Sequence, residues 1–205
     1  MKILYINYFK RIFDFILSLI LILISFPILT IAILILIFQN DGDIFFLQTR
    51  PGRKGKLFNV IKLKTMKDLY DNKGNILPDG ERITQFGNLL RKSSIDEIPQ
   101  LWNVLKGEMS LIGPRPLLVE YLPLYTDEQR RRHDIRPGIT GWAQINGRNS
   151  TKFSTRFEMD VWYVDNLSLK LDLKILFITF QKVFKSEGII IDQDPSEIAD
   201  FTVKN

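Results

Sequence analysis

The chain has 205 residues, 45% of them hydrophobic and 25% charged, so its length and composition fit one folded domain and exclude a disordered protein. It contains no cysteine, which excludes disulfides, thiolate nucleophiles and cysteine-based metal sites. The formal net charge of +5 is typical of a protein with an anionic partner, such as lipid headgroups, nucleotide phosphates or nucleic acid.

The hydrophobic residues are concentrated near the N-terminus. From residue 12 to residue 38 the single charged side chain is Asp14. As a straight helix this segment would be about 40 Å long at roughly 1.5 Å per residue, whereas a hydrocarbon core is roughly 30 Å thick. The segment shows no polar stripe, so we expect lipid on all sides rather than a buried core helix. We assign residues 1–40 to the membrane.

Two features favour a re-entrant helix, which enters and leaves the membrane on one side, over the alternative of a straight span. Pro27 lies near the middle, where it removes a backbone hydrogen bond and breaks the helix, and the Ser25 hydroxyl can bond a carbonyl freed there. Basic residues flank both ends, which places both flanks in the cytoplasm. They are Lys2, Lys10 and Arg11 before the segment and Arg50, Arg53, Lys54 and Lys56 after it.

The rest of the chain alternates short predicted elements with loops. In chain order these are a strand or hairpin at 43–64, a surface loop at 71–82, a short helix at 85–92, a helix from Ser94, a charged helical stretch at 126–134, a structured loop at 136–148, a helix at 153–163 and an amphipathic helix at 170–185. The pattern predicts a mostly helical α+β fold, with a compact domain over residues 41–188 and a polar tail over residues 189–205.

The last predicted helix has one strongly apolar face. Its members are Leu173, Leu176, Phe177, Phe180 and Phe184. We expect this face to dock on the domain core. The alternative is that it lies in the membrane interface, as amphipathic helices of monotopic proteins do.

Two adjacent carboxylates, Asp96 and Glu97, form the most informative feature outside the membrane segment. Ser94 and Glu97 have the spacing of a capping box, so a helix is expected to start here with both carboxylates in its first turn. A purely structural role is one interpretation. The functional alternative is that this helix start, with Arg91 beside it, attracts a phosphate and a metal ion. One carboxylate would then attack phosphorus while the other holds a divalent cation.

Several basic residues are presented from stiff or extended backbone. Arg115 stands between two prolines in Gly113-Pro114-Arg115-Pro116, and its guanidinium suits bidentate phosphate binding. Lys62 and Lys64 lie on one side of an extended segment, where a solvated strand face is an equally good interpretation. Arg148 repeats the pairing of arginine with a glycine-rich turn. His133, the single histidine, is expected at the surface.

The order of these motifs resembles the bacterial sugar transferases, the small monotopic phosphoglycosyl transferases, over nearly the whole chain. The matching motifs are Gln48-x-Arg50-x-Gly52, Lys62-x-Lys64-Thr65-Met66, Asp96-Glu97-x-Pro99-Gln100-x-x-Asn103-Val104, Gly113-Pro114-Arg115-Pro116, Arg136-Pro137-Gly138-Ile139-Thr140-Gly141 and Asn146-Gly147-Arg148. One departure is at the helix break. Close members of the family have serine directly before the proline, whereas here Phe26 intervenes between Ser25 and Pro27.

The resemblance implies a transferase at the cytoplasmic face of a bacterial inner membrane, with a UDP-sugar donor, an undecaprenyl phosphate acceptor and Mg²⁺. Asp96 would attack the β-phosphate, release UMP and hold a covalent phosphosugar. Glu97 would assist through the metal or through proton handling, so Asp96 and Glu97 are the predicted metal ligands. Arg91 and Arg115 would neutralise phosphate charge. Lys62 and Arg148 match further positively charged positions of the family.

The resemblance leaves the sugar and the oligomeric state open. The segment 113–124 is most similar to members that transfer phospho-N,N'-diacetylbacillosamine in protein N-glycosylation, which favours UDP-N,N'-diacetylbacillosamine over other UDP-amino sugars. Lipid is an expected partner and nucleic acid is not. Two other classes remain as alternatives. A non-enzymatic anchored module would only bind anionic lipid, and a glycosyltransferase acting at the sugar carbon would release UDP instead of UMP.

Overall fold

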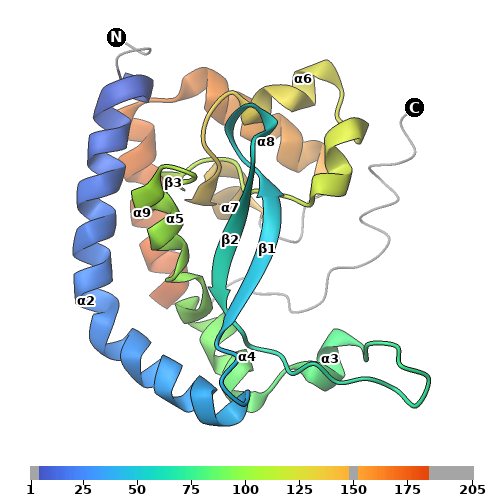
Figure 1. The fold of residues 1–205 in the computed structure, drawn as a ribbon. Helices are drawn as coiled ribbons and strands as arrows, with labels where there is room; N and C mark the ends of the chain where they lie inside the picture. The colour runs from blue at the N-terminus through green and yellow to red at the C-terminus, as the bar shows by residue number, and fades with distance from the viewer. Residues whose placement is uncertain (1–4, 148–151, 185–205) are drawn as a thin grey trace.

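The computed structural model describes residues 5–147 and 152–184 (Figure 1). In chain order the elements are η1 (Tyr5–Phe9), α2 (Lys10–Gln39), β1 (Phe45–Pro51), η2 (Arg53–Gly55), β2 (Leu57–Leu63), α3 (Asp79–Arg82), α4 (Gln85–Lys92), η3 (Ile95–Glu97), α5 (Gln100–Lys106), β3 (Ser110–Ile112), η4 (Val119–Leu124), α6 (Asp127–Arg130), η5 (Arg131–His133), β4 (Gly138–Thr140), α7 (Trp142–Asn146), α8 (Phe153–Asn166) and α9 (Leu169–Phe184). The mostly helical α+β class is confirmed. The expected polar tail at 189–205 lies outside the described residues.

The two small sheets differ in how well the sequence predicts them. Strands β1 and β2 pair antiparallel, which confirms the hairpin expected at 43–64. Strands β3 and β4 pair parallel, with Ser110 opposite Gly138 and Ile112 opposite Thr140. The structured loop expected at 136–148 is therefore wrong in part, since it contains β4 and α7. Three-residue strands are too short to show the alternation that identifies longer strands.

Helix α2 is continuous from Lys10 to Gln39 but strongly bent (Figure 1). Pro27 is the single proline in it and the physical cause of a bend, because it lacks the amide proton and crowds the preceding turn. The Ser25 hydroxyl donates to the carbonyl of Ile22 at 3.3 Å, so serine still serves a carbonyl next to the bend. The expected break is therefore a bend within one helix.

The face of α2 that packs on the domain changes character along its length. Lys10, Asp14 and Ser18 are buried, one turn apart, in its first half, and Ala32 and Leu36 are buried in its second half. The expectation of lipid on all sides of residues 12–38 is wrong for this face, because Asp14, Ser18, Ala32 and Leu36 are buried. Three polar residues among so many apolar ones were too sparse to identify, and each is satisfied or enclosed by the domain rather than by lipid.

The first turns of α2 hold two parts of the domain. The Arg11 guanidinium donates to the carbonyls of Val104 at 2.5 Å and Leu105 at 2.6 Å, near the C-terminus of α5. Asp14 Oδ1 accepts the Leu111 backbone N–H of β3 at 3.1 Å. The start of α2 is thus hydrogen-bonded to both α5 and β3.

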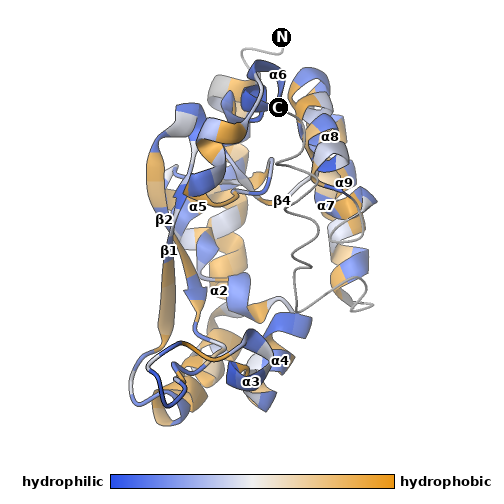
Figure 2. Cartoon of the chain, turned by 90° about the vertical axis from the view of Figure 1, so that its right-hand side faces the viewer, coloured by the Kyte–Doolittle hydropathy of each residue, from blue (hydrophilic) through white to orange (hydrophobic). Residues whose placement is uncertain are grey.

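The opposite face of α2 is exposed and apolar. The hydropathy colouring marks most of this part of the chain as hydrophobic (Figure 2). Helix α2 is the helix in the described part of the chain that is long and apolar enough to cross a membrane. Exposed apolar side chains include Leu23, Ile24, Phe26, Ile31 and Phe38. A surface of this kind is stable only against lipid or another apolar partner.

The main core lies between the hairpin, α5, β3 and the last two helices. Phe58, Val104, Ile112, Tyr163 and Ile175 all belong to it. Buried Asn103 fastens the hairpin to α5. Its Oδ1 accepts from the Ile61 backbone N–H at 3.1 Å, and its Nδ2 donates to the Asn59 carbonyl and to Glu108 Oε2, each at 2.8 Å.

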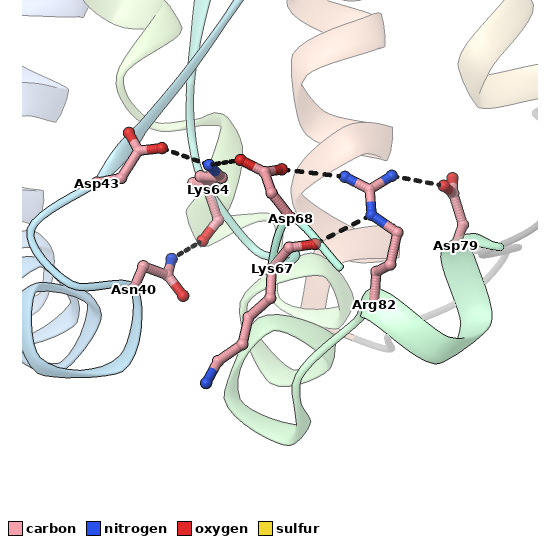
Figure 3. Close-up of polar contacts among 7 residues, drawn as sticks. All are labelled: Asn40, Asp43, Lys64, Lys67, Asp68, Asp79 and Arg82. Atoms are coloured by element: carbon pink, nitrogen blue, oxygen red, sulfur yellow. Dashed lines mark hydrogen bonds and ion pairs between the residues drawn. The ribbon is translucent and has the colours of Figure 1, made fainter. Parts of the chain in front are cut away.

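A charged network ties the far end of α2 to the loop before α4 (Figure 3). Lys64 forms ion pairs with Asp43 and with Asp68, the latter at 2.6 Å, and its carbonyl accepts from Asn40 Nδ2 at 2.8 Å. Arg82 continues the network to Asp68 at 3.3 Å. Lys64 is therefore structural, and the two lysines of its motif have different roles.

Helix α9 buries a different face from the one that the sequence predicts. Ile175 and Asp172 are buried, whereas Leu173 and Phe177 are 49% and 64% exposed, and Phe180 is exposed as well. The prediction that Leu173, Phe177 and Phe180 dock on the core is wrong, whereas Leu176 of the same face does pack against it. The side chain of Phe184 lies outside the described part of the structure. Asp172 lies on the face of α9 that packs against the core, although an aspartate is normally expected on the solvent side of a helix. The sequence pattern therefore indicated the wrong face as the buried one.

Candidate active site

The local backbone at the carboxylate pair differs from the expected capping box. Ser94 is left-handed, at φ 57°, and its side chain makes no capping bond. A 3-10 turn follows at Ile95–Glu97, and α5 begins only at Gln100. The predicted capping box is wrong, because the Glu97 carboxylate is bound to cations and not to the backbone of Ser94.

Glu97 is the centre of a cationic cluster. Its Oε1 accepts from Lys62 Nζ and from Arg115 Nη2, each at 2.7 Å. These donors come from β2 and from the Pro114–Pro116 segment, 35 and 18 residues away in sequence. The structure therefore brings together three of the residues that the motifs selected.

The two adjacent carboxylates have opposite electrostatic environments. Asp96 is 8% exposed, and burial together with the charge of Glu97 raises its pKa to about 6. The pKa of Glu97 is lowered, because the attraction of Arg115 and Lys62 outweighs the cost of its burial. At neutral pH both are ionised, but Asp96 is the less stabilised anion and hence the better nucleophile.

Arg91 reaches the site from the end of α4. Its charge lowers the pKa of Asp96, against the effect of burial. The Thr65 hydroxyl accepts from Arg91 Nε at 2.9 Å, which fixes the guanidinium on one side. Thr65 belongs to the motif Lys62-x-Lys64-Thr65-Met66, but the sequence alone does not identify it as a site residue. Its role depends on a contact between residues 26 positions apart.

Arg115 is held by its backbone. A Cβ on Gly113 would lie 2.4 Å from the Arg136 carbonyl, so glycine is required where this segment crosses the Arg136-Pro137-Gly138 turn. Arg132 Nη2 donates to the Arg115 carbonyl at 2.8 Å. Arg132 is in turn fixed by a buried ion pair with Asp160 at 2.7 Å. The Arg136 motif therefore supports the Arg115 motif.

Two remaining expectations have different outcomes. His133 is buried, 7% exposed, so its expected surface position is wrong. It stacks edge-on against Tyr125 with ring centroids 5.4 Å apart. Arg148 lies outside the described residues, and its role stays a prediction.

The chemistry of the pair fits a magnesium ion. Mg²⁺ prefers oxygen ligands and is commonly held by one or two carboxylates, with water and substrate phosphates completing its shell. Within residues 5–147 and 152–184 no cluster of three or more acidic, histidine or cysteine side chains forms a complete metal site. Asp96 and the second oxygen of Glu97 offer the partial set that such an ion takes together with phosphate.

A buried carboxylate among cations, in a chain with a long exposed apolar helix, is the arrangement expected of a membrane-associated enzyme that acts on phosphate-bearing substrates. The chain belongs to the bacterial sugar transferase family, whose family model matches residues 5–186.

The chain is similar to several curated relatives. It is 55% identical over 180 residues to the sugar transferase EpsL of Bacillus subtilis (strain 168), named as uncharacterized, covering 88% of this chain and 89% of that one. It is 37% identical over 199 residues to the undecaprenyl-phosphate galactose phosphotransferase of Salmonella typhimurium, covering 89% of this chain and 42% of that one. It is 39% identical over 189 residues to the UDP-glucose:undecaprenyl-phosphate glucose-1-phosphate transferase of Escherichia coli, covering 87% and 41%.

The chain thus spans most of EpsL but only about two fifths of the galactose and glucose enzymes.

Proposed function

We propose that this protein transfers a sugar 1-phosphate from a UDP-sugar to undecaprenyl phosphate through a covalent intermediate on Asp96. The observation that carries the proposal is the position of a buried, poorly stabilised carboxylate next to Lys62, Arg91 and Arg115. The names of the galactose and glucose relatives support the same reaction class.

In the first half-reaction an oxygen of Asp96 attacks the β-phosphorus of the donor. The bond from that phosphorus to the bridging oxygen breaks, and UMP leaves with the electron pair. Lys62 and Arg115, which both bind the neighbouring Glu97, neutralise charge on the phosphoryl oxygens in this proposal as the bond changes. A Mg²⁺ ion held by Asp96 and Glu97 would add further neutralisation of phosphate charge.

In the second half-reaction a phosphate oxygen of undecaprenyl phosphate attacks the same phosphorus. The bond to Asp96 breaks, and the products are undecaprenyl diphosphosugar and the free carboxylate. Glu97, held by two cations, stays ionised throughout. It therefore acts by orienting Lys62 and Arg115 rather than by giving up a proton.

The experiment is a nucleotide assay on the full chain in detergent or nanodiscs. With UDP-sugar and no acceptor, the wild type is expected to release one UMP per enzyme in a burst, and steady turnover is expected to need undecaprenyl phosphate. Asp96→Asn should show neither. Full UMP release by Asp96→Asn would overturn the nucleophile.

The same assay separates the alternatives. Release of UDP instead of UMP identifies attack at the sugar carbon. Lipid binding with no nucleotide product identifies the non-enzymatic module. Release of UMP only when donor and acceptor are both present identifies direct transfer without a covalent intermediate. Addition and chelation of Mg²⁺ in this assay tests the metal requirement.

The sugar is the least constrained part of the proposal. The likeness of residues 113–124 supports UDP-N,N'-diacetylbacillosamine, whereas the relatives' names support galactose and glucose as the sugar. A panel of these three donors with UDP-N-acetylglucosamine, scored by the rate of UMP release, decides among them. A bacillosamine enzyme is expected to reject both hexoses.

We further propose that α2 is re-entrant at the cytoplasmic face of the inner membrane. Both ends of the helix are bonded to the same domain, through the Lys10–Asp172 ion pair at 2.7 Å and the bond from Asn40 to the Lys64 carbonyl. The two ends therefore belong on one side of the bilayer. Accessibility tags at Met1 and Asn205 are both expected to report the cytoplasm, and a periplasmic Met1 would support a straight span.

A further inference from the structure

A cavity lies directly beside the carboxylate pair, between the hairpin and the Pro114–Pro116 segment. Its polar lining consists of Gln48, Arg50, Lys62, Gln100 and Arg115. Lys62 and Arg115 are the residues that bind Glu97, so the cavity shares a wall with the site described above. Its volume is about 50 Å³ in this structure, and it is partly open to solvent. No carboxylate stands in this lining, which makes the cavity strongly cationic.

Arg50 brings a charge into this cavity that the protein does not neutralise. Within the described part of the chain it forms no ion pair, and its Nη2 donates to a neutral acceptor, Gln48 Oε1, at 2.5 Å. Burial and the neighbouring charge of Arg115 lower its pKa, and Glu120 offsets this only in part. Two guanidiniums facing one cavity are stable when an anion joins them.

Gln100 adds an unused donor to the same cavity. The side chain is 3% exposed, and its Nε2 has no hydrogen-bond partner among the described residues. A buried amide donor without an acceptor costs free energy, so it usually has a partner that is present only in the functional state. Here that partner must accept hydrogen bonds and, given Arg50, carry negative charge.

We propose that Arg50 and Gln100 bind the α-phosphate of the donor nucleotide, which is the phosphate that leaves in UMP. The inference rests on the proposed function, because it takes the β-phosphate to lie at Asp96. The α-phosphate is then one bridging oxygen away, and the cavity is the adjoining cationic space that carries the unpartnered Gln100 amide donor. Arg50 and Gln100 thereby orient the leaving group and stabilise the charge it acquires.

A phosphate monoester is the shared chemistry of two ligands, UMP and the acceptor lipid phosphate. The donor is favoured because Gln100 and Arg50 are enclosed between the hairpin and Arg115, whereas a polyprenyl chain needs an apolar route to its phosphate. The apolar part of the lining is limited to Phe46, Val60 and Pro116, beside three cations and two amides. The experiment keeps the two sources separate.

The test measures equilibrium binding of UMP and of uridine to the full chain in detergent, in an Asp96→Asn background where no chemistry occurs. Arg50→Gln and Gln100→Leu are each expected to weaken UMP binding about tenfold, since each removes a hydrogen bond to a charged group. Uridine binding is expected to stay within about twofold, because uridine lacks the phosphate. Lys56→Gln removes the same charge from an exposed position beside the hairpin turn and is expected to change neither affinity.

Unchanged UMP binding in both variants would overturn the proposal, and so would an equal loss for UMP and uridine, which indicates base binding or misfolding. A third arm uses a short polyprenyl phosphate as competitor. If the variants weaken its binding and leave UMP unaffected, the cavity belongs to the acceptor and the proposal is wrong. Failure of the covalent mechanism appears separately, as UMP release by Asp96→Asn.

Discussion

Lys10 and Asp172 form a buried ion pair at 2.7 Å, with side chains 6% and 0% exposed, between the first turn of α2 and α9. Asp172 also accepts from the hydroxyls of Tyr5 at 2.8 Å and Tyr163 at 2.6 Å. One carboxylate therefore joins the long apolar helix α2 to the last two helices of the domain.

The pair predicts unequal costs for removing its two members. Asp172→Leu leaves the Lys10 ammonium buried without an anion, and the expected loss is about 3–5 kcal/mol in the free energy of unfolding. Lys10→Met leaves a carboxylate that keeps two hydroxyl donors, so a smaller loss is expected. Chemical denaturation in detergent measures both. Equal costs, or a larger cost for Lys10→Met, would contradict the role given to the tyrosines.

Asp96→Asn is expected to stabilise the fold while it abolishes UMP release. The pKa of Asp96 is raised to about 6, so the ionised carboxylate is less stable in the folded chain than in the unfolded chain at neutral pH. Removing that charge should add about 1–3 kcal/mol at pH 7. The advantage of the variant should shrink as the pH falls below about 6, because Asp96 in the folded wild type then binds a proton and loses its charge. The matched control, Asp41→Asn, changes an exposed aspartate in a left-handed backbone position that asparagine also tolerates, and should leave the unfolding midpoint nearly unchanged.

His133 predicts an acid-sensitive contribution of the opposite sign. Burial and the charge of Arg132 lower its pKa to about 4, whereas the unfolded histidine titrates near 6.5. Between these values the unfolded chain binds the proton and the folded chain does not. The free energy of unfolding therefore decreases as the pH is lowered. The expected loss from pH 7 to pH 5 is about 1–2 kcal/mol.

His133→Gln should abolish this part of the pH dependence, which is read from the difference between the unfolding curves of the two proteins. An unchanged slope in His133→Gln would show that the titrating group lies elsewhere.

The exposed face of α9 predicts a membrane contact that can be measured directly. The chain has no cysteine, so single-cysteine labels need no prior substitution. An environment-sensitive dye on Phe177→Cys is expected to shift to the blue in vesicles and to resist an aqueous quencher. The same dye on Glu158→Cys, an exposed position of α8, is expected to do neither. Equal quenching at the two positions would place α9 in water.

The sequence was sufficient for features that depend on residue type in a fixed order. Asp96, Glu97, Lys62 and Arg115 were all selected from motifs, and the structure places Lys62 and Arg115 on Glu97. The hairpin and the long helices follow from periodicity. These features are local, or belong to rigid segments whose ends carry the functional groups.

Features that depend on contacts across the chain were not predictable in the same way. Ser94 and Glu97 have the spacing of a capping box, but the left-handed backbone of Ser94 leaves its side chain without a capping bond. The burial of His133 and Asp172 depends on helices that pack from elsewhere. Gln100 is informative only because its amide is enclosed without a partner. In each case tertiary packing overrides the local preference, and a single sequence does not reveal which partner is near.

The bonds from Arg11 and Asp14 to α5 and β3 have a consequence for the timing of biosynthesis. Strand β3 leads to Arg115, and α5 follows the carboxylate pair, so the first turns of the anchor brace both walls of the reaction centre. A ribosome releases α2 before any of these parts. These contacts can therefore form only after the chain has been made beyond Leu111, so both walls are braced after the apolar helix has left the ribosome and not before.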